Sequence, residues 1–226
     1  FDPTLDFAVL TQEERRIYTG SGEYSMLLHM ADKHFVYEFM RLGIELTPFN
    51  TLGHIAGVHY VAMHAARQLA ALHVPLDLGL VSGAAAGHDI GKYGCKKSEE
   101  KRIPYLHYYY TDLCFNRFDM PMIGHIAANH STWDLELDNL SAESLLLIYA
   151  DFRVKSSRDA AGQEVVHFYS LAESFDVILN KLDNVDAAKE HRYHKVYNKL
   201  RDFESYMQSL GVLTDLPQLP RKLPPK

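Results

Sequence analysis

Histidine and aspartate stand side by side at the end of an apolar stretch in "SGAAAGHDIGKYG", residues 82 to 94. The small residues before them suit close packing, so the carboxylate of Asp89 is expected in or near the protein interior. A buried carboxylate costs several kcal/mol unless a cation pairs with it. The pair His88–Asp89 therefore predicts a nearby cation, and imidazole with carboxylate is a donor set that divalent metal ions accept.

Other histidine and aspartate residues fall on the apolar faces of separate predicted helices. His130 lies four residues after Ile126, and Asp151 lies four residues after Leu147, so both are expected to point inward. His125 points about 140° away from His130 on the same helix and is expected at the surface. A single inward histidine is more often a packed core residue than a ligand. Several of them near a buried His-Asp pair favour a metal site.

Helices are expected to carry most of these residues, so the predicted fold class is an all-α bundle. The expected helices cover about 51–73, a stretch that ends near His88, 104–117, 121–130 and 141–152, with Pro121 and Ser141 as start signals. Residues 91–104 are expected to form a polar loop. Two short β-prone runs that flank "RDAAGQ" predict a small β-hairpin within 153–169.

The remaining segments complete the expected domain organisation. A capping box, Ser170 with Glu173, starts a further helical segment. An apolar stripe from Tyr193 to Leu210 marks a long last helix. The segments are an N-terminal helical segment (1–50), a core (51–157), a hairpin with helices that pack on the core (158–212), and a proline-rich linker or tail (213–226). Because the chain begins at Phe1 and ends in that proline-rich stretch, we expect a piece of a longer protein with other domains.

Composition restricts the classes of function. The formal net charge of −6 argues against a nucleic-acid-binding surface. No apolar stretch has the length needed to span a bilayer, and no signal-peptide pattern opens the chain. The chain has two cysteines, Cys95 and Cys114, in unrelated contexts. We therefore expect no disulfide framework and a cytoplasmic setting.

Five short motifs follow one another along the chain: "HIAGV" (54–58), "HDIGK" (88–92), "LH" (106–107), "NHST" (129–132) and "ADF" (150–152). In content and order they resemble the motifs of the HD superfamily of metal-dependent phosphohydrolases. The resemblance covers somewhat under half of the chain. It implies an HD-domain helical bundle that hydrolyses a phosphorylated substrate with a metal-activated water.

The resemblance also implies a ligand set for one or two divalent ions: His54, His88, Asp89, His107, His130 and Asp151. His107 and His130 have a role only where a second ion binds. Periodicity alone leaves His107 open between a ligand and a packed aromatic neighbour. His59 lies at a more usual distance before His88, but the pattern "HxxGV" favours His54 as the first ligand.

The residue types indicate which ions and which catalytic groups to expect. Imidazoles and carboxylates without a thiolate suit Fe, Mn, Ni, Co, Zn or Mg rather than a structural zinc site. Asp89 is expected to be catalytic as the carboxylate shared by the ions. Lys92 would bind a phosphate oxygen, as in the family, or be a solvated loop lysine. Arg158, seven residues after Asp151, would reach a phosphate if the helix continued that far, and would otherwise be an ordinary hairpin residue.

The motifs leave the substrate open within the nucleotide class. The branch that opens cyclic di-GMP carries a second adjacent histidine and a Gly-Tyr-Pro sequence, which are not found after His130. "YADFRVKSSRD" is more similar to the HD-domain dinucleoside tetraphosphate hydrolases, and cyclic di-AMP phosphodiesterases share the order of the five motifs. The expected substrate is a dinucleoside polyphosphate, a cyclic dinucleotide or a nucleotide.

Two other functional classes remain open at this point. The first is a non-catalytic regulatory module that binds a nucleotide or a metal within a larger protein. The second is a di-iron oxygenase, although the additional ligands of that branch are not evident in this sequence. The aromatic-rich stripe within 170–211 is interpreted as core or as an interface, so a homodimer is also an expectation.

Overall fold

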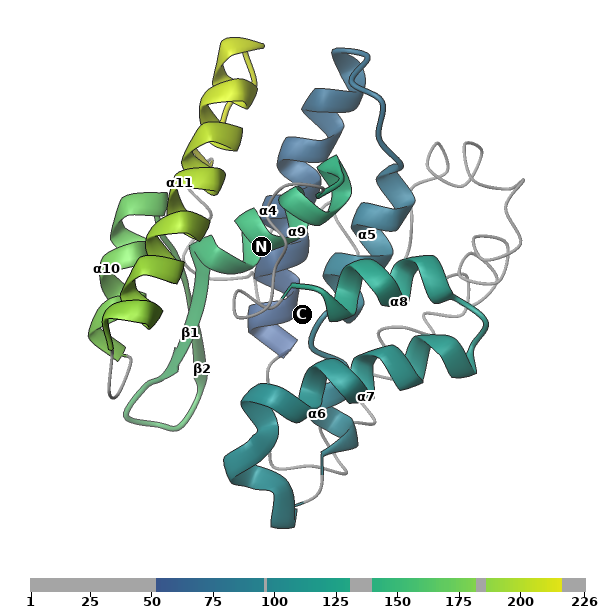
Figure 1. Cartoon of the computed structure of the whole chain (residues 1–226), viewed down its shortest axis with the longest axis vertical. Helices are drawn as coiled ribbons and strands as arrows, with labels where there is room; N and C mark the ends of the chain where they lie inside the picture. Colours follow the sequence, from purple (N-terminus) through teal and green to yellow (C-terminus); the bar gives the residue numbers. More distant parts are fainter. Residues whose placement is uncertain (1–51, 96, 131–139, 182–185, 217–226) are drawn as a thin grey trace.

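The computed structural model describes residues 52–95, 97–130, 140–181 and 186–216. In chain order its elements are α4 (Leu52–Ala71), α5 (Leu78–Gly87), α6 (Gly91–Gly94), the 3₁₀ helix η1 (Lys97–Arg102), α7 (Ile103–Arg117), α8 (Pro121–Ala128), α9 (Ala142–Arg153), β1 (Val154–Arg158), β2 (Glu164–Phe168), α10 (Leu171–Lys181) and α11 (Ala187–Ser209) (Figure 1). The predicted all-α class with a small β-hairpin is confirmed. The helices expected within 1–50 lie outside the described residues.

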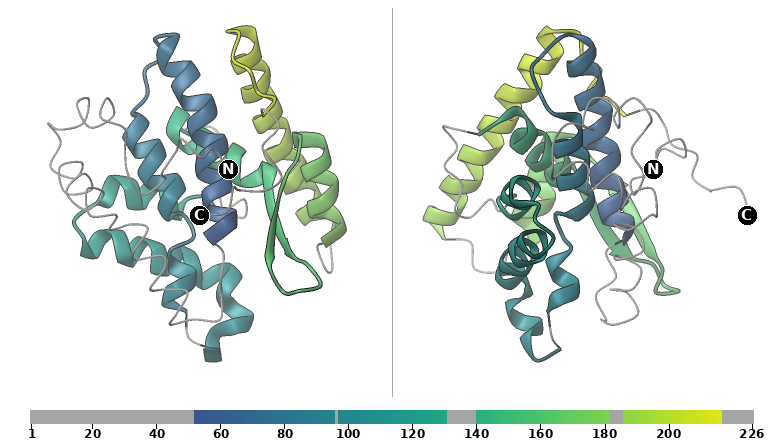
Figure 2. Two further views of the ribbon diagram at one scale, coloured as in Figure 1. Left: turned by 180° about the vertical axis from the view of Figure 1, so that it is seen from behind. Right: turned by 90° about the vertical axis from the view of Figure 1, so that its right-hand side faces the viewer.

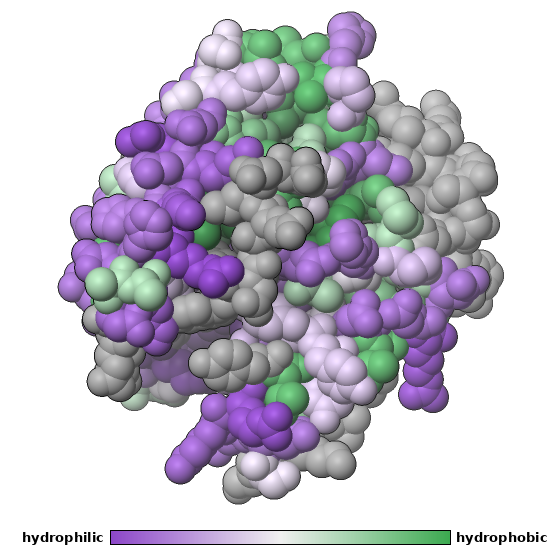
Figure 3. All heavy atoms as spheres, in the orientation of Figure 1, coloured by the Kyte–Doolittle hydropathy of each residue, from purple (hydrophilic) through white to green (hydrophobic). Residues whose placement is uncertain are grey.

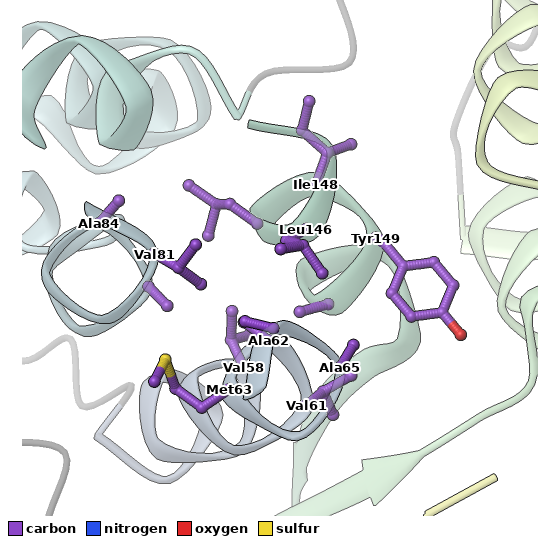
Figure 4. Packing of buried hydrophobic residues seen from close by; sticks show 14 of the residues in the cluster. Val58, Val61, Ala62, Met63, Ala65, Val81, Ala84, Leu146, Ile148 and Tyr149 are labelled. Atoms are coloured by element: carbon purple, nitrogen blue, oxygen red, sulfur yellow. The ribbon is translucent and has the colours of Figure 1, made fainter. Parts of the chain in front are cut away.

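The core lies where α4, α5 and α9 meet. Val58 and Ala62 of α4 face Val81 of α5 and Leu146 of α9, and all four side chains are almost fully buried (Figure 4). Alanine and glycine dominate the second half of α5 and let this helix pack closely against α4. Burial on several sides explains why α5 ends in a run of small residues.

A second layer of helices covers α5 on the side away from the hairpin. Helix α8 packs on α5, and α7 packs on both α8 and α6 (Figures 1 and 2). Pro121 occupies the first turn of α8, where its missing N–H is not needed. The Ser141 hydroxyl accepts a hydrogen bond from the Ser144 N–H at the start of α9. Pro121 and Ser141 therefore mark the starts of α8 and α9, as predicted.

Strands β1 and β2 pair antiparallel, from Val154 opposite Phe168 to Arg158 opposite Glu164. The hairpin lies beside the first half of α4 in every view (Figures 1 and 2). The hairpin connects the end of α9 to α10 and lies next to α4, the helix that carries His54. The predicted hairpin is thus present, within slightly narrower bounds.

The C-terminal helices pack on the core through the apolar stripe of α11. Tyr193, Val196, Leu200, Phe203 and Met207 are buried, whereas Leu210 follows the helix and is exposed. The capping box at α10 forms as expected, because the Glu173 carboxylate accepts hydrogen bonds from the N–H and the hydroxyl of Ser170.

A buried arginine links α9 to the segment after α11. Arg153 donates to the Tyr149 hydroxyl at 2.5 Å and to the Thr214 carbonyl at 2.8 Å, and Thr214 is buried. The backbone of Leu213 also exchanges hydrogen bonds with the Gln68 side chain on α4. Leu213 and Thr214, which the sequence analysis assigned to the linker or tail, are therefore hydrogen-bonded to α4 and α9.

Residues 91–104 do not form the polar loop that was expected, because they fold into α6, η1 and the first residues of α7.

Both cysteines are free thiols, as expected. Polar residues cover much of the face in Figure 3, and apolar side chains gather at its upper end, where α4 and α11 end. In the described part of the chain, every helix is too short or too polar to span a bilayer.

Candidate metal centre

Asp89 lies at the centre of a cluster of buried histidines and is only 1% exposed. Its Oδ2 atom is 3.7 Å from the Nε2 atoms of both His54 and His88. Its Oδ1 atom is 3.7 Å from Nε2 of His107 and 3.9 Å from Nε2 of His130. Each carboxylate oxygen therefore faces a different pair of imidazoles.

A sharp turn between α5 and α6 holds the His-Asp pair in this position. The turn lies directly against α7, because a Cβ atom on Gly91 would be 1.9 Å from the His107 carbonyl oxygen. The buried Thr111 hydroxyl fixes the contact, since it accepts from the Gly91 N–H and donates to the His88 carbonyl. Glycine in "HDIG" thus allows two backbones that carry candidate ligands to approach each other closely.

The first group of candidate ligands comprises His54, His88, Asp89 and Asp151, from α4, the turn after α5, and α9. His54 Nε2 is 3.1 Å from Asp151 Oδ1 and 3.4 Å from His88 Nε2. Asp151 Oδ1 is also 3.9 Å from His88 Nε2. Two imidazole nitrogens and two carboxylate oxygens from three segments therefore converge on one small volume. These four residues form the first position.

The second group comprises Asp89, His107 and His130, and is called the second position. His107 comes from α7, and His130 follows the end of α8. The His88 and His107 rings lie 4.9 Å and 5.5 Å from the His130 ring, and the half-buried Tyr108 ring packs against both His107 and His130. Among the described residues, three members of the first position (His54, His88 and Asp89) have donor atoms within 4.8 Å of one another, and so do the three members of the second. The two sets share Asp89.

Backbone carbonyls fix the tautomers of three of these histidines. The Nδ1 atom of His88 lies 2.9 Å from the Ala85 carbonyl, that of His107 lies 2.7 Å from the Ile103 carbonyl, and that of His130 lies 2.5 Å from the Ala127 carbonyl. A carbonyl oxygen only accepts, so each Nδ1 carries the proton. Each Nε2 then presents its lone pair to the cluster, which is the state that a metal ligand requires.

Burial keeps the imidazoles of His88, His107 and His130 neutral, and nearby positive charges keep the two carboxylates ionised. Burial lowers the pKa of His107 to about 4 and that of His130 to about 4. Burial alone would raise the pKa of Asp89, but Lys92 and the surrounding histidines outweigh it and hold that pKa below its usual range. Lys155 and His54 likewise hold the pKa of Asp151 well below its usual range against the effect of burial. All of these groups are therefore in their metal-binding protonation states at neutral pH.

Lys92 lies at the edge of the cluster, one turn beyond Asp89. Its Nζ atom is 2.5 Å from Asp89 Oδ2, and its side chain is 24% exposed. Asp151 has a similar partial exposure of 25%, whereas the histidines of the cluster are buried. Among the described residues of the site, Lys92 and Asp151 mark the side that faces solvent.

Three other residues from the sequence analysis lie away from the cluster. His59 is buried, but its Nε2 atom lies 2.9 Å from the Ser82 hydroxyl. Arg158 is exposed at the end of β1 and donates to the Gly162 carbonyl within the hairpin. The helical phase that would have brought Arg158 under Asp151 does not apply, because α9 ends at Arg153. His125 is exposed, as expected.

Three residues that the sequence did not single out also contact the site: Thr111, Lys155 and Glu164. Lys155 donates to the Asp151 carbonyl at 2.7 Å, but it lies in β1, so helical spacing does not indicate this contact. The Glu164 carboxylate accepts from the backbone N–H groups of Gly53 and His54. That contact spans 110 residues, so no local pattern indicates it.

The donor chemistry fits divalent metal ions. His88, His107 and His130 present Nε2 lone pairs to the cluster, the carboxylates of Asp89 and Asp151 are ionised, and no thiolate takes part, which suits Mn, Fe, Co, Ni, Zn or Mg. Lys92 pairs with one oxygen of Asp89, and a bound ion would add to the compensation of the two carboxylates. A comparison of the chain with family models, with curated proteins and with solved structures finds no match.

Proposed function

We propose that this protein is a metal-dependent phosphohydrolase that acts on a nucleotide-type phosphoester or phosphoanhydride. The observation that carries the proposal is the placement of Asp89, whose two carboxylate oxygens each face a different pair of buried histidines. A carboxylate that is shared in this way is suited to bridge two divalent ions. The order of the HD-like motifs in the sequence supports the same class of function.

The ions would supply Lewis-acid activation of a water molecule and of the phosphoryl oxygens. The protein's part is to hold the ligands in position before the substrate arrives. Backbone carbonyls orient His88, His107 and His130, so the rings do not have to rotate when metal binds. The rigid turn around Gly91 keeps Asp89 between them.

Lys92 is the group proposed to contact the substrate. Its ammonium already lies against Asp89 at the solvent-facing edge of the site, where a phosphate would approach. A lysine there would donate to a non-bridging phosphate oxygen and offset its negative charge. Arg158 is not included, because it is exposed and bonded within the hairpin turn.

Metal analysis combined with a hydrolysis screen tests this proposal. The purified protein would be loaded with Mn²⁺ and assayed against bis(p-nitrophenyl) phosphate, p-nitrophenyl phosphate, mononucleotides, cyclic dinucleotides and dinucleoside polyphosphates. We expect about two ions per chain and metal-dependent hydrolysis that is lost in Asp89→Asn but retained in Asp112→Asn, an exposed residue of α7.

The alternative function gives a different result in the same experiment. A regulatory module would bind metal or a nucleotide without hydrolysing any of these substrates, in the wild type as in the variants. That outcome would contradict the enzymatic proposal while leaving the metal centre in place. Absence of bound metal in the wild type would contradict the enzymatic proposal and would leave only a regulatory module that binds a nucleotide without metal.

A further inference from the structure

We propose that the β1–β2 hairpin is the positioning element of the first metal position, with Glu164 holding His54 in place. The inference rests on the proposed function only in that metal must bind at the first position. It assigns Glu164 and Lys155 as positioning residues, since they act through the candidate ligands and do not belong to the ligand groups themselves.

Glu164 binds the first turn of α4 with both carboxylate oxygens. Oε2 accepts from the Gly53 N–H at 2.8 Å, and Oε1 accepts from the His54 N–H at 3.1 Å. The first N–H groups of a helix have no partner within the helix, and the helix dipole attracts negative charge there. A carboxylate from a distant strand therefore satisfies the donors that lie directly at a candidate ligand.

The hairpin is also seated against α4 one turn further along. A Cβ atom on Gly57 would lie 2.9 Å from Val154 Cγ1 and 3.1 Å from Val166 Cγ1. Glycine at this position lets the strands pack directly on the helix (Figure 1). The contact explains the glycine of "HIAGV", because a larger side chain would push away the strand that carries Glu164.

The same hairpin contacts the backbone of Asp151, the other residue that offers a carboxylate to the first position. Lys155 of β1 donates to the Asp151 carbonyl at 2.7 Å, and its charge helps to keep the Asp151 carboxylate ionised. One strand thus supports Asp151, and the other supports His54. The Nε2 atom of His54 is 3.1 Å from Asp151 Oδ1, so the two supported groups are direct neighbours.

The second position is supported in another way. His107 and His130 are oriented by the carbonyls of Ile103 and Ala127 in their own segments, and the turn at Gly91 packs on α7. A disturbance of the hairpin should therefore weaken metal binding at the first position and leave the second unchanged. A purely structural role of Glu164 would not separate the two positions.

The test uses the whole chain and Mn²⁺ titrations by calorimetry. Glu164→Gln keeps the size of the side chain but directs an amide N–H₂ group at one of the two backbone donors. It would be made in a His130→Ala background, which retains the first position, and in a His54→Ala background, which retains the second. Glu173→Gln is the matched control, because Glu173 accepts from a backbone N–H at the start of α10 in the same way.

We expect Glu164→Gln to weaken Mn²⁺ binding about ten- to a hundred-fold in the His130→Ala background, the usual effect of losing an outer-shell partner. Affinity in the His54→Ala background should stay within about two-fold, and Glu173→Gln should change neither. Gly57→Ala, which displaces the hairpin by another route, should reproduce the selective loss.

Equal affinity with and without Glu164→Gln in the His130→Ala background would overturn the inference, as would equal weakening at both positions. Either result would leave the proposed function intact, because the wild type would still bind its metal. A wild type that binds no Mn²⁺ would instead overturn the proposed function, and the inference with it. The three failures are therefore distinguishable.

Discussion

Asp89 is the residue on which both groups of candidate ligands depend, because each of its oxygens faces a different pair of histidines. Asp89→Ala is expected to remove metal from both positions together, since neither keeps its shared carboxylate. Elemental analysis of the purified variant checks this, with Asp112→Asn as a control on the surface of α7. Retention of full metal content in Asp89→Ala would contradict the assignment.

His54 and His59 offer a matched pair on one helix. His54 lies within hydrogen-bond distance of Asp151, whereas His59 contacts Ser82 away from the cluster. His54→Ala should lose the ion of the first position, and His59→Gln should keep both ions. Metal content measured by mass spectrometry decides between them. The opposite pattern would mean that the His59 side of α4 carries the ligand.

The sequence located the candidate ligands better than the residues that support them. The six candidate ligands from the motifs lie in one cluster, because they occupy inward positions of helices and a short rigid turn. Glu164 was not foreseen, since its bonds to Gly53 and His54 connect segments more than 100 residues apart. Arg158 was placed by helical phase, which fails once the chain turns into β1 at Val154.

At the level of elements, the turn from α5 to α6 carries the closest backbone approach in the site. Gly91→Ala would place a Cβ atom against the His107 carbonyl, and backbone atoms cannot rotate away as a side chain can. The free energy of unfolding should fall by about 1–3 kcal/mol or more. The second position should lose affinity with it, because His107 moves relative to Asp89.

Chemical denaturation and Mn²⁺ titration of Gly91→Ala measure these two effects. Gly211→Ala is the control: it has a positive φ of 87° and open space around it. The control should cost about 1–2 kcal/mol from backbone strain alone and leave metal binding unchanged. Normal Mn²⁺ affinity in Gly91→Ala would show that the close approach does not position the second site.

Helices with clear ends were predictable, and short ones were not. Pro121, Ser141 and the Ser170–Glu173 pair mark starts that the structure uses, because each satisfies or removes an unpaired N–H group. Helix α6 has four residues and is too short to show a period. The following η1 is rich in charge, so a polar loop was the wrong expectation for both.

At the scale of the whole molecule, buried neutral histidines make folding sensitive to acid. The pKa of His59 is lowered by burial from 6.5 to about 3, and those of His107 and His130 to about 4. Below about pH 6.5 the unfolded chain takes up protons that the folded chain does not. The stability that these neutral histidines contribute is fully present above that pH. It is lost progressively as the pH falls toward their pKa values in the folded state.

Each such histidine should contribute up to about 1.4 kcal/mol of lost stability per pH unit over its own window. Urea denaturation in chelator between pH 7 and pH 4 measures the slope without metal. His59→Gln should reduce that slope, because the glutamine does not titrate and His59 lies outside the cluster. An unchanged slope in His59→Gln would contradict the account of this residue.

The packed part of the molecule extends further than composition indicated. The proline-rich character of 213–226 predicted a tail, but Leu213 and Thr214 are bonded to Gln68 and Arg153. These two residues are held by partners on α4 and α9. Amino-acid composition carries no information about such long-range partners. The predicted all-α class needed only the apolar periods of the helices, which is why it was reached from the sequence.

Anomalous diffraction from crystals of the protein grown with Mn²⁺ is the measurement that tests the central claim most directly. The account predicts two peaks, one among His54, His88, Asp89 and Asp151 and the other among Asp89, His107 and His130, with the Asp89 carboxylate between them. A single peak with His107 and His130 turned away from it would contradict the shared-carboxylate centre. Absence of any peak at these residues would contradict the metal site altogether.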